Sequence, residues 1–327
     1  MQVIIPLAGK GTRLRPHTHL TPKPMLKVAG RPVIDWVMDK LKGLKVDELI
    51  FITGHLKEQV EEYARAQYDI PSRFIEQEVQ DGTAGAVNLA RPFVKGPVMI
   101  IFVDTVFEAD LTLAEQSDVD GIIWAKEVED YQRFGVVVTN EFGYMTKIVE
   151  KPTEPISKLA NIGLYYIRDV ESLWRGIDAV LAAPANKGEY FLTDAFQHMI
   201  DNGRRILTAE VGGWYDCGQL GTTLDTNAVL LAQGTFPLPK VGKDVTLIEP
   251  VRIPDGCVLE GCTVGPNVTL DEGCAVRNST ISDSIIGARC VIEGSSLVRT
   301  MLGDDVVVRD FHGSGSIGSN STVAGKT

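Results

Sequence analysis

The most restrictive feature of this 327-residue chain is an apolar repeat that begins near residue 241. Apolar residues recur there every five or six positions, at Val241, Leu247, Ile253, Leu259, Val264, Leu270, Val276, Ile281, Ile286, Ile292, Leu297 and Leu302. An α-helix has a period of 3.6 residues and a strand has a period of two, so neither explains this spacing. A repeat near six is typical of a parallel β-helix, whose stacked coils bury one another's apolar faces.

Residues 241–310 resemble the hexapeptide-repeat left-handed β-helix, in which three hexads make one coil, and their length predicts about four coils. The residue four positions after each apolar anchor is mostly small or β-branched, and we expect it to point into the coil. Three of the five cysteines occupy this inward position, namely Cys257, Cys274 and Cys290. Cys262 lies one position before it. We therefore predict that these cysteines have a structural role in the coils, since an odd total number of cysteines without a CxxC pair favours neither a disulfide framework nor a zinc site.

The first 235 residues alternate between strand-like and helix-like segments. Strands are predicted at Val3–Leu7, Glu48–Thr53, Phe74–Gln77, Val98–Val103, Gly121–Ala125, Gly135–Val138 and Ile162–Ile167. Helices are predicted at Val33–Leu44, Glu58–Gln67, Thr83–Ala90, and near residues 169–182 and 192–202. This order predicts an α/β fold with a Rossmann-like, mostly parallel sheet sandwiched by helices. We expect a domain at 1–235, a β-helix at 241–310 and a flexible, Gly- and Ser-rich tail at 311–327.

The composition excludes several classes of function. The net charge of −11 disfavours generic nucleic-acid binding, which requires a basic surface. The longest apolar runs are far shorter than the roughly 20 residues of a membrane-spanning helix. Residues 1–8 lack the basic start and the cleavage site of a signal peptide and suit a first strand better, so we expect a cytoplasmic protein.

The charge is unevenly distributed, because residues 1–34 contain six basic and no acidic side chains. A glycine-rich turn, residues 7–16, follows the first predicted strand, and its glycines let the backbone approach a ligand. The turn lacks the Walker A pattern, and Leu14 replaces the third glycine of a dinucleotide fingerprint. Arg13 follows the glycines, and Lys23 lies between two prolines that stiffen the backbone. Two rigidly held cations beside backbone N–H groups suit a polyphosphate.

Several motifs occur in an order that resembles the sugar-phosphate nucleotidyltransferases. They are Gly9-x-Gly-Thr-Arg-Leu-x-Pro16, Pro22-Lys-Pro24, Gln77 with Asp81-Gly-Thr-Ala84, Arg133-Phe-Gly-Val-Val137, Val149-Glu-Lys-Pro152, Asn161-Ile-Gly163, Glu189-Tyr-Phe-Leu-Thr-Asp194 and Trp214-Tyr-Asp-Cys-Gly218. The similarity spans roughly residues 1–232. The trailing hexapeptide repeat resembles the long forms of glucose-1-phosphate thymidylyltransferases and UDP-sugar pyrophosphorylases.

The resemblance implies Mg²⁺-dependent transfer of a nucleotidyl group from a nucleoside triphosphate to a sugar 1-phosphate by direct in-line displacement, with release of pyrophosphate. We expect dTTP or UTP and glucose 1-phosphate as substrates, although the sequence names neither the sugar nor the pentose. Three alternatives stay open: a mannose-1-phosphate guanylyltransferase, a catalytically silent paralogue that binds sugar nucleotides, and a bifunctional enzyme whose β-helix is an acyltransferase. The last lacks a histidine between residues 241 and 310 to act as a base.

The resemblance also assigns roles to residues. Residues expected to neutralise the reacting phosphates are Arg13, Lys23 and Lys151. Residues expected to bind the nucleotide are Leu7, Gly9, Gly11, Thr12, Gln77, Gly82 and Asp104. Residues expected to bind the sugar phosphate are Gly135, Glu150, Lys151, Asn161 and Tyr165. Mg²⁺ is expected at Asp104 and Asp216, whose hard oxygens suit this cation.

Two further expectations concern Val103 and the β-helix. The family commonly has glycine before the metal-binding aspartate, whereas this chain has Val103 before Asp104. That departure keeps the silent paralogue open. The exposed face and open end of a β-helix favour self-association, so we expect a homo-oligomer, a dimer or tetramer.

Overall fold

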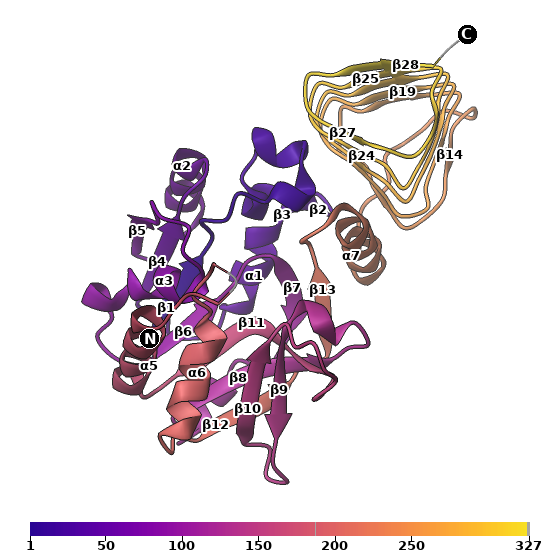
Figure 1. The fold of residues 1–327 in the computed structure, drawn as a ribbon. Helices are drawn as coiled ribbons and strands as arrows, with labels where there is room; N and C mark the ends of the chain where they lie inside the picture. The colour runs from indigo at the N-terminus through magenta and orange to yellow at the C-terminus, as the bar shows by residue number, and fades with distance from the viewer. Residues whose placement is uncertain (187, 326–327) are drawn as a thin grey trace. The chain divides into compact units, whose positions relative to one another are not determined.

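The computed structural model describes residues 1–186 and 188–325, which form two compact units (Figure 1). The first unit contains Met1–Lys10 and Val37–Trp214. The second contains Gly11–Trp36 and the chain from Tyr215 onward. In the described residues, no helix is both long enough and apolar enough to cross a membrane.

The first unit is built on a nine-stranded mixed sheet. Its parallel part contains, in spatial order, β6 (Val98–Ile101), β1 (Gln2–Pro6), β4 (Glu48–Thr53) and β5 (Ser72–Glu76). All five residues of β1 are buried, because β1 pairs with a strand on each side and helices cover both faces of the sheet.

The rest of the sheet is largely antiparallel, which the expected βαβ alternation did not predict. It contains β8 (Gly121–Glu127), β9 (Gly135–Thr139), β10 (Met145–Glu150), β11 (Leu159–Ile167) and β12 (Ile206–Glu210). Strand β11 runs antiparallel to β6, β8 and β9, whereas β12 runs parallel to β8. A separate pair joins β7 (Thr105–Glu108) to β13 (Gly213–Asp216). The predicted strands are confirmed with shifted ends, and the sheet is mixed.

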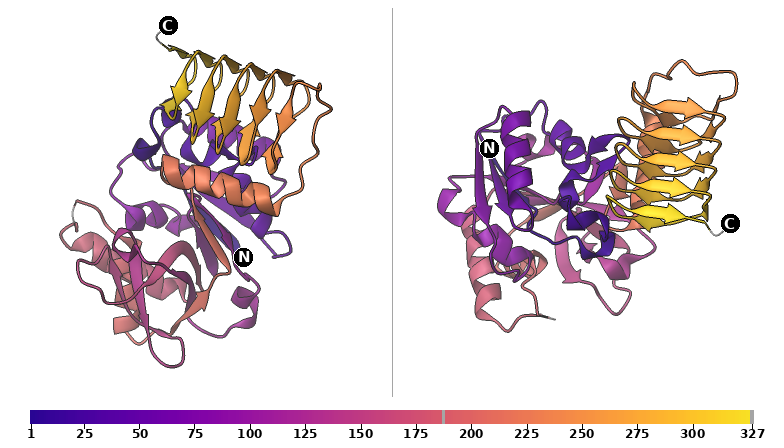
Figure 2. Two further views of the ribbon diagram at one scale, coloured as in Figure 1. Left: turned by 90° about the vertical axis from the view of Figure 1, so that its right-hand side faces the viewer. Right: turned by 90° about the horizontal axis from the view of Figure 1, so that it is seen from above.

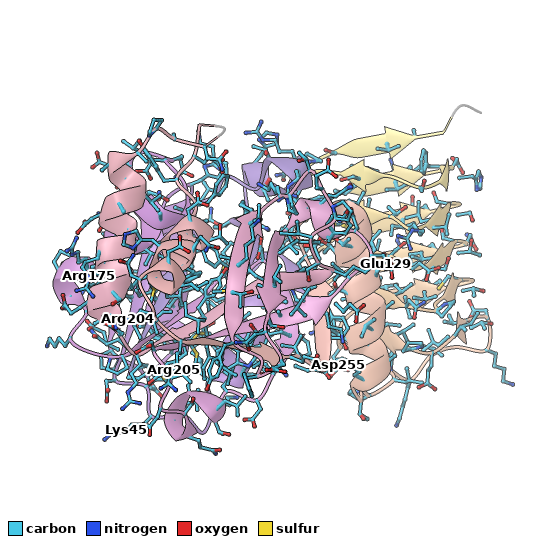
Figure 3. All side chains as sticks on the ribbon, turned by 60° about the horizontal axis from the view of Figure 1, so that its bottom comes forward. Lys45, Glu129, Arg175, Arg204, Arg205 and Asp255 are labelled. Atoms are coloured by element: carbon cyan, nitrogen blue, oxygen red, sulfur yellow. The ribbon has the colours of Figure 1, made fainter. Side chains whose placement is uncertain are left out.

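Helices α3 (Thr83–Asn88), α5 (Val170–Ala182) and α6 (Leu192–Asp201) share one apolar core with the sheet. The α-helices before residue 215 also include α1 (Val33–Lys40), α2 (Lys57–Gln67) and the short α4 (Leu113–Gln116). Val87, Trp174 and Phe196 from three of these helices share a cluster with strand residues such as Ile4. Asp169 caps the start of α5, because its Oδ1 accepts a hydrogen bond from the Ser172 N–H at 3.0 Å. Arg175 and Arg204, which are labelled in Figure 3, both donate to the Ser172 hydroxyl, at 2.6 and 2.8 Å.

The second unit contains stacked, short parallel strands, as the left-handed β-helix prediction required (Figure 2). The described strands form three five-stranded sheets. The first contains β14 (Thr246–Leu247), β17 (Thr263–Val264), β20 (Thr280–Ser282), β23 (Ser296–Val298) and β26 (His312–Gly313). The second contains β15 (Val251–Arg252), β18 (Val268–Leu270), β21 (Ile285–Ile286), β24 (Met301–Leu302) and β27 (Ser316–Ile317). The third contains β16 (Val258–Glu260), β19 (Ala275–Arg277), β22 (Val291–Glu293), β25 (Val307–Arg309) and β28 (Thr322–Ala324).

The apolar anchors form vertical columns within these sheets. Leu259, Val276 and Ile292 are paired in register from coil to coil, and the column continues through Val308. Val241 is wrongly included in the repeat, because it is 40% exposed and lies before the first strand. The anchor period therefore predicted the coil interior correctly from Leu247 onward.

Two details of the repeat differ from expectation. The predicted flexible tail at 311–327 is wrong over His312–Ala324, where β26, β27 and β28 add a further coil, while residues 326–327 lie outside the described chain. Where two apolar anchors are five residues apart instead of six, that side of the coil is one residue shorter. The side chain that points into the coil then lies one position earlier than expected. Cys262, Ser279 and Ser295 are therefore buried, and Thr280 and Ser296 are exposed.

The N-terminal segment of the second unit packs against its β-helix and α7 (Leu220–Gln233). Asn227 of α7 is fully buried, and its Oδ1 accepts hydrogen bonds from the Ala29 N–H (2.8 Å) and the Thr269 hydroxyl (2.7 Å). Its Nδ2 donates to the Asn267 carbonyl at 3.2 Å. One amide therefore ties the segment 11–36, helix α7 and a coil of the β-helix together.

We predict that Asn227→Ala lowers the free energy of unfolding by about 2–4 kcal/mol, because it leaves buried donors and an acceptor without their partner. Asp225→Ala on the same helix is the control, since it removes only an exposed ion pair with Arg299 and should cost less than about 1 kcal/mol. Urea unfolding followed by circular dichroism measures both. Equal losses in the two variants would contradict the bridging role of Asn227.

Candidate functional site

The glycine-rich turn starts where β1 ends and crosses the boundary between the two units. The Leu7 N–H donates to the Ile52 carbonyl at 2.9 Å, which extends the pairing with β4 by one residue. A Cβ added to Gly9 would have no atom within 4 Å, so this glycine leaves open space above the backbone. Gly11 has φ +60°, and a Cβ there would lie 2.9 Å from the Thr18 methyl group. Both glycines therefore serve a tight turn with an accessible backbone.

Arg13 and Lys23 are both carried by the second unit. Arg13 is exposed on the short 3₁₀ turn Thr12–Leu14, which directly follows Gly11. Lys23 is the first residue of another 3₁₀ turn, Lys23–Met25, and it lies between Pro22 and Pro24. Its Cβ lies 3.2 Å from a Cβ position built on Gly11. The structure thus brings Lys23 against the glycine turn, as the polyphosphate hypothesis requires.

His17, in the same segment, packs inside the protein. Its side chain is buried, and burial lowers the pKa of His17 to about 4. Its Nε2 lies 3.0 Å from the Ser316 hydroxyl of the β-helix. A neutral, buried imidazole is unsuited to neutralising phosphate, so His17 has a structural role in this segment.

Gln77 lies at the end of β5 and is 7% exposed. Its backbone N–H donates to the Thr53 carbonyl at 2.8 Å. Its side-chain Nε2 donates to Asp81 Oδ1 (2.9 Å) and to the Gly82 carbonyl (3.2 Å). Gly82 has φ +118°, and any side chain there would collide with the Tyr190 backbone. The structure therefore brings the two predicted base-reading residues, Gln77 and Gly82, into direct contact.

Gly135, Glu150 and Asn161 come from three neighbouring strands and meet at one point. A Cβ added to Gly135 would lie 2.7 Å from Asn161 Nδ2 and 2.9 Å from Glu150 Oε2. The Thr193 hydroxyl donates to Glu150 Oε2 at 3.2 Å, and its methyl carbon would lie 3.0 Å from the same Cβ. Three of the predicted sugar-binding residues are thus adjacent, and a side chain at position 135 would displace the polar ends of Asn161 and Glu150.

Tyr165 is buried beneath this group and orients Asn161. Its hydroxyl donates to Asn161 Oδ1 at 2.5 Å, and the Gly163 N–H donates to the same oxygen at 2.8 Å. Burial raises the pKa of Tyr165, and the charges of Glu150 and Asp104 raise it further, so the phenol stays protonated. Both bonds to Oδ1 leave the Nδ2 end of Asn161 directed toward Gly135. Tyr165 therefore positions a binding residue from the core.

Lys151 lies next to this group in a strained conformation. Its φ is +44°, a left-handed value that is rare for a residue with a side chain. Its N–H donates to the Phe134 carbonyl at 3.0 Å, and its Nζ lies 3.8 Å from Glu150 Oε1 and 5.2 Å from the centre of the Phe191 ring. Burial raises the pKa of Glu150, and the Lys151 charge and the Thr193 hydrogen bond only partly offset this effect.

The two aspartates expected to bind Mg²⁺ belong to different units. Asp104 follows β6, at the carboxyl edge of the parallel strands, and Val103 before it is 4% exposed. Asp216 ends β13, and its Oδ1 accepts a hydrogen bond from the Gly218 N–H at 2.7 Å. The described residues contain no cluster of three or more histidine, cysteine, aspartate or glutamate side chains placed to hold a metal ion. Two carboxylates alone fit Mg²⁺, which keeps water and phosphate oxygens as its other ligands.

Three residues of this region were not predicted as functional: Asp81, Phe191 and Thr193. Asp81 contacts Gln77, Thr193 contacts Glu150, and Phe191 lies beside Lys151. All three lie within motifs that the sequence analysis quoted, Asp81-Gly-Thr-Ala84 and Glu189–Asp194. The motifs could have pointed to these three residues as functional, but the role of each side chain depends on contacts that the sequence does not show.

Comparisons with known proteins agree with this arrangement. The family model described as nucleotidyl transferase matches residues 2–233. The chain is 31% identical over 328 residues to the bifunctional protein GlmU of Methanococcus aeolicus, covering 89% of this chain and 78% of that protein. It is 32% identical over 221 residues to the UTP–glucose-1-phosphate uridylyltransferase AglF of Haloferax volcanii, covering 65% of this chain and 89% of that protein.

A similar fold occurs in the crystal structure of a UDP-glucose pyrophosphorylase complexed with UDP-glucose. The TM-score is 0.61 at 21% sequence identity. The match covers 71% of this chain and 99% of that chain, and it supports the fold assignment alone.

We predict that Glu150→Gln becomes more stable relative to the wild type as the pH rises from about 4 to about 8. The pKa of Glu150 is higher in the folded protein than in the unfolded chain, where it is about 4.3. Glu150 therefore contributes stability at pH values below the unfolded pKa, and this contribution is lost as the pH rises through the pKa of the folded state. Glutamine cannot ionise and loses nothing over this range. Urea unfolding at several pH values measures the difference, with the exposed Glu154→Gln as control. A difference that is constant with pH would contradict the effect of burial.

Proposed function

We propose that this chain, which belongs to the nucleotidyl transferase family, acts on sugar phosphates and transfers a nucleotidyl group from dTTP or UTP to glucose 1-phosphate. The observation that carries this proposal is the cluster of Gly135, Glu150 and Asn161 beside Lys151 in one unit. It combines polar groups for sugar hydroxyls with a cation for the sugar's phosphate.

The acceptor half of the reaction rests on this cluster. The Glu150 carboxylate accepts hydrogen bonds from hydroxyl groups, and the Asn161 amide nitrogen donates them. Gly135 leaves room for the sugar ring, because a methyl group there would lie within 3 Å of both polar side chains. Lys151 supplies positive charge at the edge of the cluster and aligns the sugar phosphate for attack.

The donor half rests on the glycine turn and its cations. The backbone N–H groups near Gly9 and Gly11, together with Thr12, receive the triphosphate, and Leu7 borders the nucleoside. Arg13 and Lys23 neutralise the pyrophosphate as it leaves. Gln77 and Gly82 read the base, and Asp104 lies beside the nucleotide. The name of the archaeal relative AglF supports UTP and glucose 1-phosphate among the candidates.

The proposed chemistry is a direct displacement at the α-phosphorus. A sugar phosphate oxygen forms the new P–O bond, and the bond from the α-phosphorus to the oxygen that bridges it to the β-phosphate breaks. That oxygen and its electron pair leave with pyrophosphate. Asp104 and Asp216 would hold Mg²⁺, which supplies charge neutralisation to the phosphates when it is bound. The residues of this chain align the two anions and counter their repulsion.

We also propose that copies of the chain associate through the β-helix into a dimer or tetramer. The outer surface of the β-helix carries the exposed apolar side chains of Val258 and Val298. Light scattering that finds only the 35.6 kDa monomer at micromolar concentration would exclude this association.

A pyrophosphate-release assay tests the proposed function. It crosses dTTP, UTP, GTP, CTP and ATP with glucose-, N-acetylglucosamine-, galactose- and mannose-1-phosphate, with and without EDTA. We expect release with dTTP or UTP, highest with glucose 1-phosphate, and loss of activity in EDTA. Turnover with GTP and mannose 1-phosphate would change the substrate assignment. Nucleotide binding without release from any pair would favour a silent paralogue and make Val103 the residue to examine.

We predict that Gly135→Ala lowers kcat/KM for the sugar 1-phosphate by about 100-fold, because a methyl group displaces Glu150 and Asn161 from the sugar. The affinity for the nucleotide should change by less than about twofold, which steady-state kinetics and calorimetry measure separately. Gly96→Ala is the control, since a Cβ there meets no atom within 4 Å. Equal losses for both substrates would show that Gly135 supports the fold and not the acceptor.

A further inference from the structure

The loop after β5 contains a carboxylate in direct contact with the predicted base-reading amide. We propose that Asp81 is a specificity-determining positioning residue, which fixes the Gln77 amide so that its oxygen, and not its nitrogen, is presented to the nucleobase. This inference rests on the proposed function, because it assumes that Gln77 faces the base of a nucleoside triphosphate.

The orientation of the amide follows from the chemistry of its two partners. Gln77 Nε2 lies 2.9 Å from Asp81 Oδ1 and 3.2 Å from the Gly82 carbonyl oxygen. An ionised carboxylate and a backbone carbonyl accept hydrogen bonds and donate none. A flipped amide would place Oε1 against both oxygens and would lose two hydrogen bonds in a buried position. Both N–H groups are thus used inside the protein, and Oε1 remains to accept from a ligand.

The Asp81 carboxylate is itself held in place. The Asp81 N–H donates to the Val79 carbonyl at 2.9 Å, and the Tyr190 N–H donates to the Asp81 carbonyl at 2.8 Å. The carboxylate lies directly over Gly85 in α3, where any side chain would collide with Asp81 Oδ1. The loop therefore cannot shift away from Gln77 without breaking contacts on both sides. All of these residues belong to the first unit.

A fixed acceptor oxygen distinguishes two classes of nucleobase. Uracil and thymine have an N–H group between two carbonyls, and guanine has an N–H group beside its carbonyl. Cytosine and adenine have an unprotonated ring nitrogen beside an amino group at the corresponding position. An acceptor such as Oε1 that faces this ring position pairs with the first class and repels the lone pair of the second. The locked amide therefore selects bases with a ring N–H, and a freely rotating amide would accept both classes.

The test is the ratio of nucleotide affinities in Asp81→Asn. Isothermal titration calorimetry with UTP, dTTP, GTP, CTP and ATP in Mg²⁺ buffer, without sugar phosphate, gives each Kd. In the wild type we expect UTP or dTTP to bind at least about tenfold more tightly than CTP and ATP. Asparagine offers a donor as well as an acceptor, so the amide can turn, and the preference should fall below about threefold. A gain in CTP and ATP affinity is the signature of lost selection, because a merely structural role would weaken every nucleotide equally.

Two controls complete the design. Glu78→Gln removes the same charge from an exposed neighbour and should keep the wild-type ratio. Gln77→Met removes the amide and should abolish the preference whatever occupies position 81. If Asp81→Asn fails to fold, Asp81→Ser replaces it, since a hydroxyl also both donates and accepts.

The outcomes separate this inference from the proposed function. A wild type that binds no nucleotide overturns the proposed function and with it the assumption made here. A wild type that prefers UTP or dTTP, with the same ratio in Asp81→Asn, leaves the function intact and overturns the role of Asp81. A wild type without preference between the two classes of base overturns the selection by Gln77.

Discussion

The pairing of β1 with β4 on one side and β6 on the other is the constraint on which the first unit depends. Parallel strands in register end together, so the segments that follow them emerge at one edge of the sheet. The glycine turn follows β1, Gln77 follows β5, and Asp104 follows β6. These three predicted functional segments therefore share one edge of the sheet, although up to about a hundred residues of sequence separate them. The core strands are buried and cannot shift their register, so this arrangement is fixed.

In the second unit, the β-helix contacts the segment 11–36, which is predicted to bind phosphate. Residues 11–36 carry Arg13 and Lys23, and their contacts group them with α7 and the β-helix coils. The buried amide of Asn227, the ion pair between Lys27 and Asp271, and the contact of His17 with Ser316 all join this segment to the repeat. A stack of coils is rigid because each coil is hydrogen-bonded to the next along three sheets. Such a scaffold suits two cations that must stay fixed while charge moves between phosphates.

The sequence predicted those features that follow from a local period or a motif. The five- and six-residue spacing identified the coil interior, and the apolar run at Val98 identified a buried strand. Strands β8, β9 and β11 were predicted, but their antiparallel pairing was not. Strands β10 and β12 were missed because their mixed composition shows no clear alternation. The last coil was mistaken for a tail, because Gly313 and Ser316 replace the expected apolar and small β-branched residues. The contact of Asp81 with Gln77 depends on loop geometry, which no residue spacing reveals.

The acceptor cluster contains features that are unfavourable for folding. Lys151 has a left-handed backbone, and the Glu150 carboxylate is buried enough to raise its pKa despite a nearby lysine. Non-glycine residues with positive φ also occur in the β-helix, where most are asparagine or aspartate, which tolerate this conformation, and two are Arg289 and Arg299. Lysine has no such tolerance, so the strain at position 151 is retained only because its surroundings hold it there. The Phe134 carbonyl fixes its N–H, and the Phe191 ring lies beside its amine. Backbone strain, a carboxylate with a raised pKa and a crowded glycine therefore occur together at the residues predicted to bind the sugar phosphate.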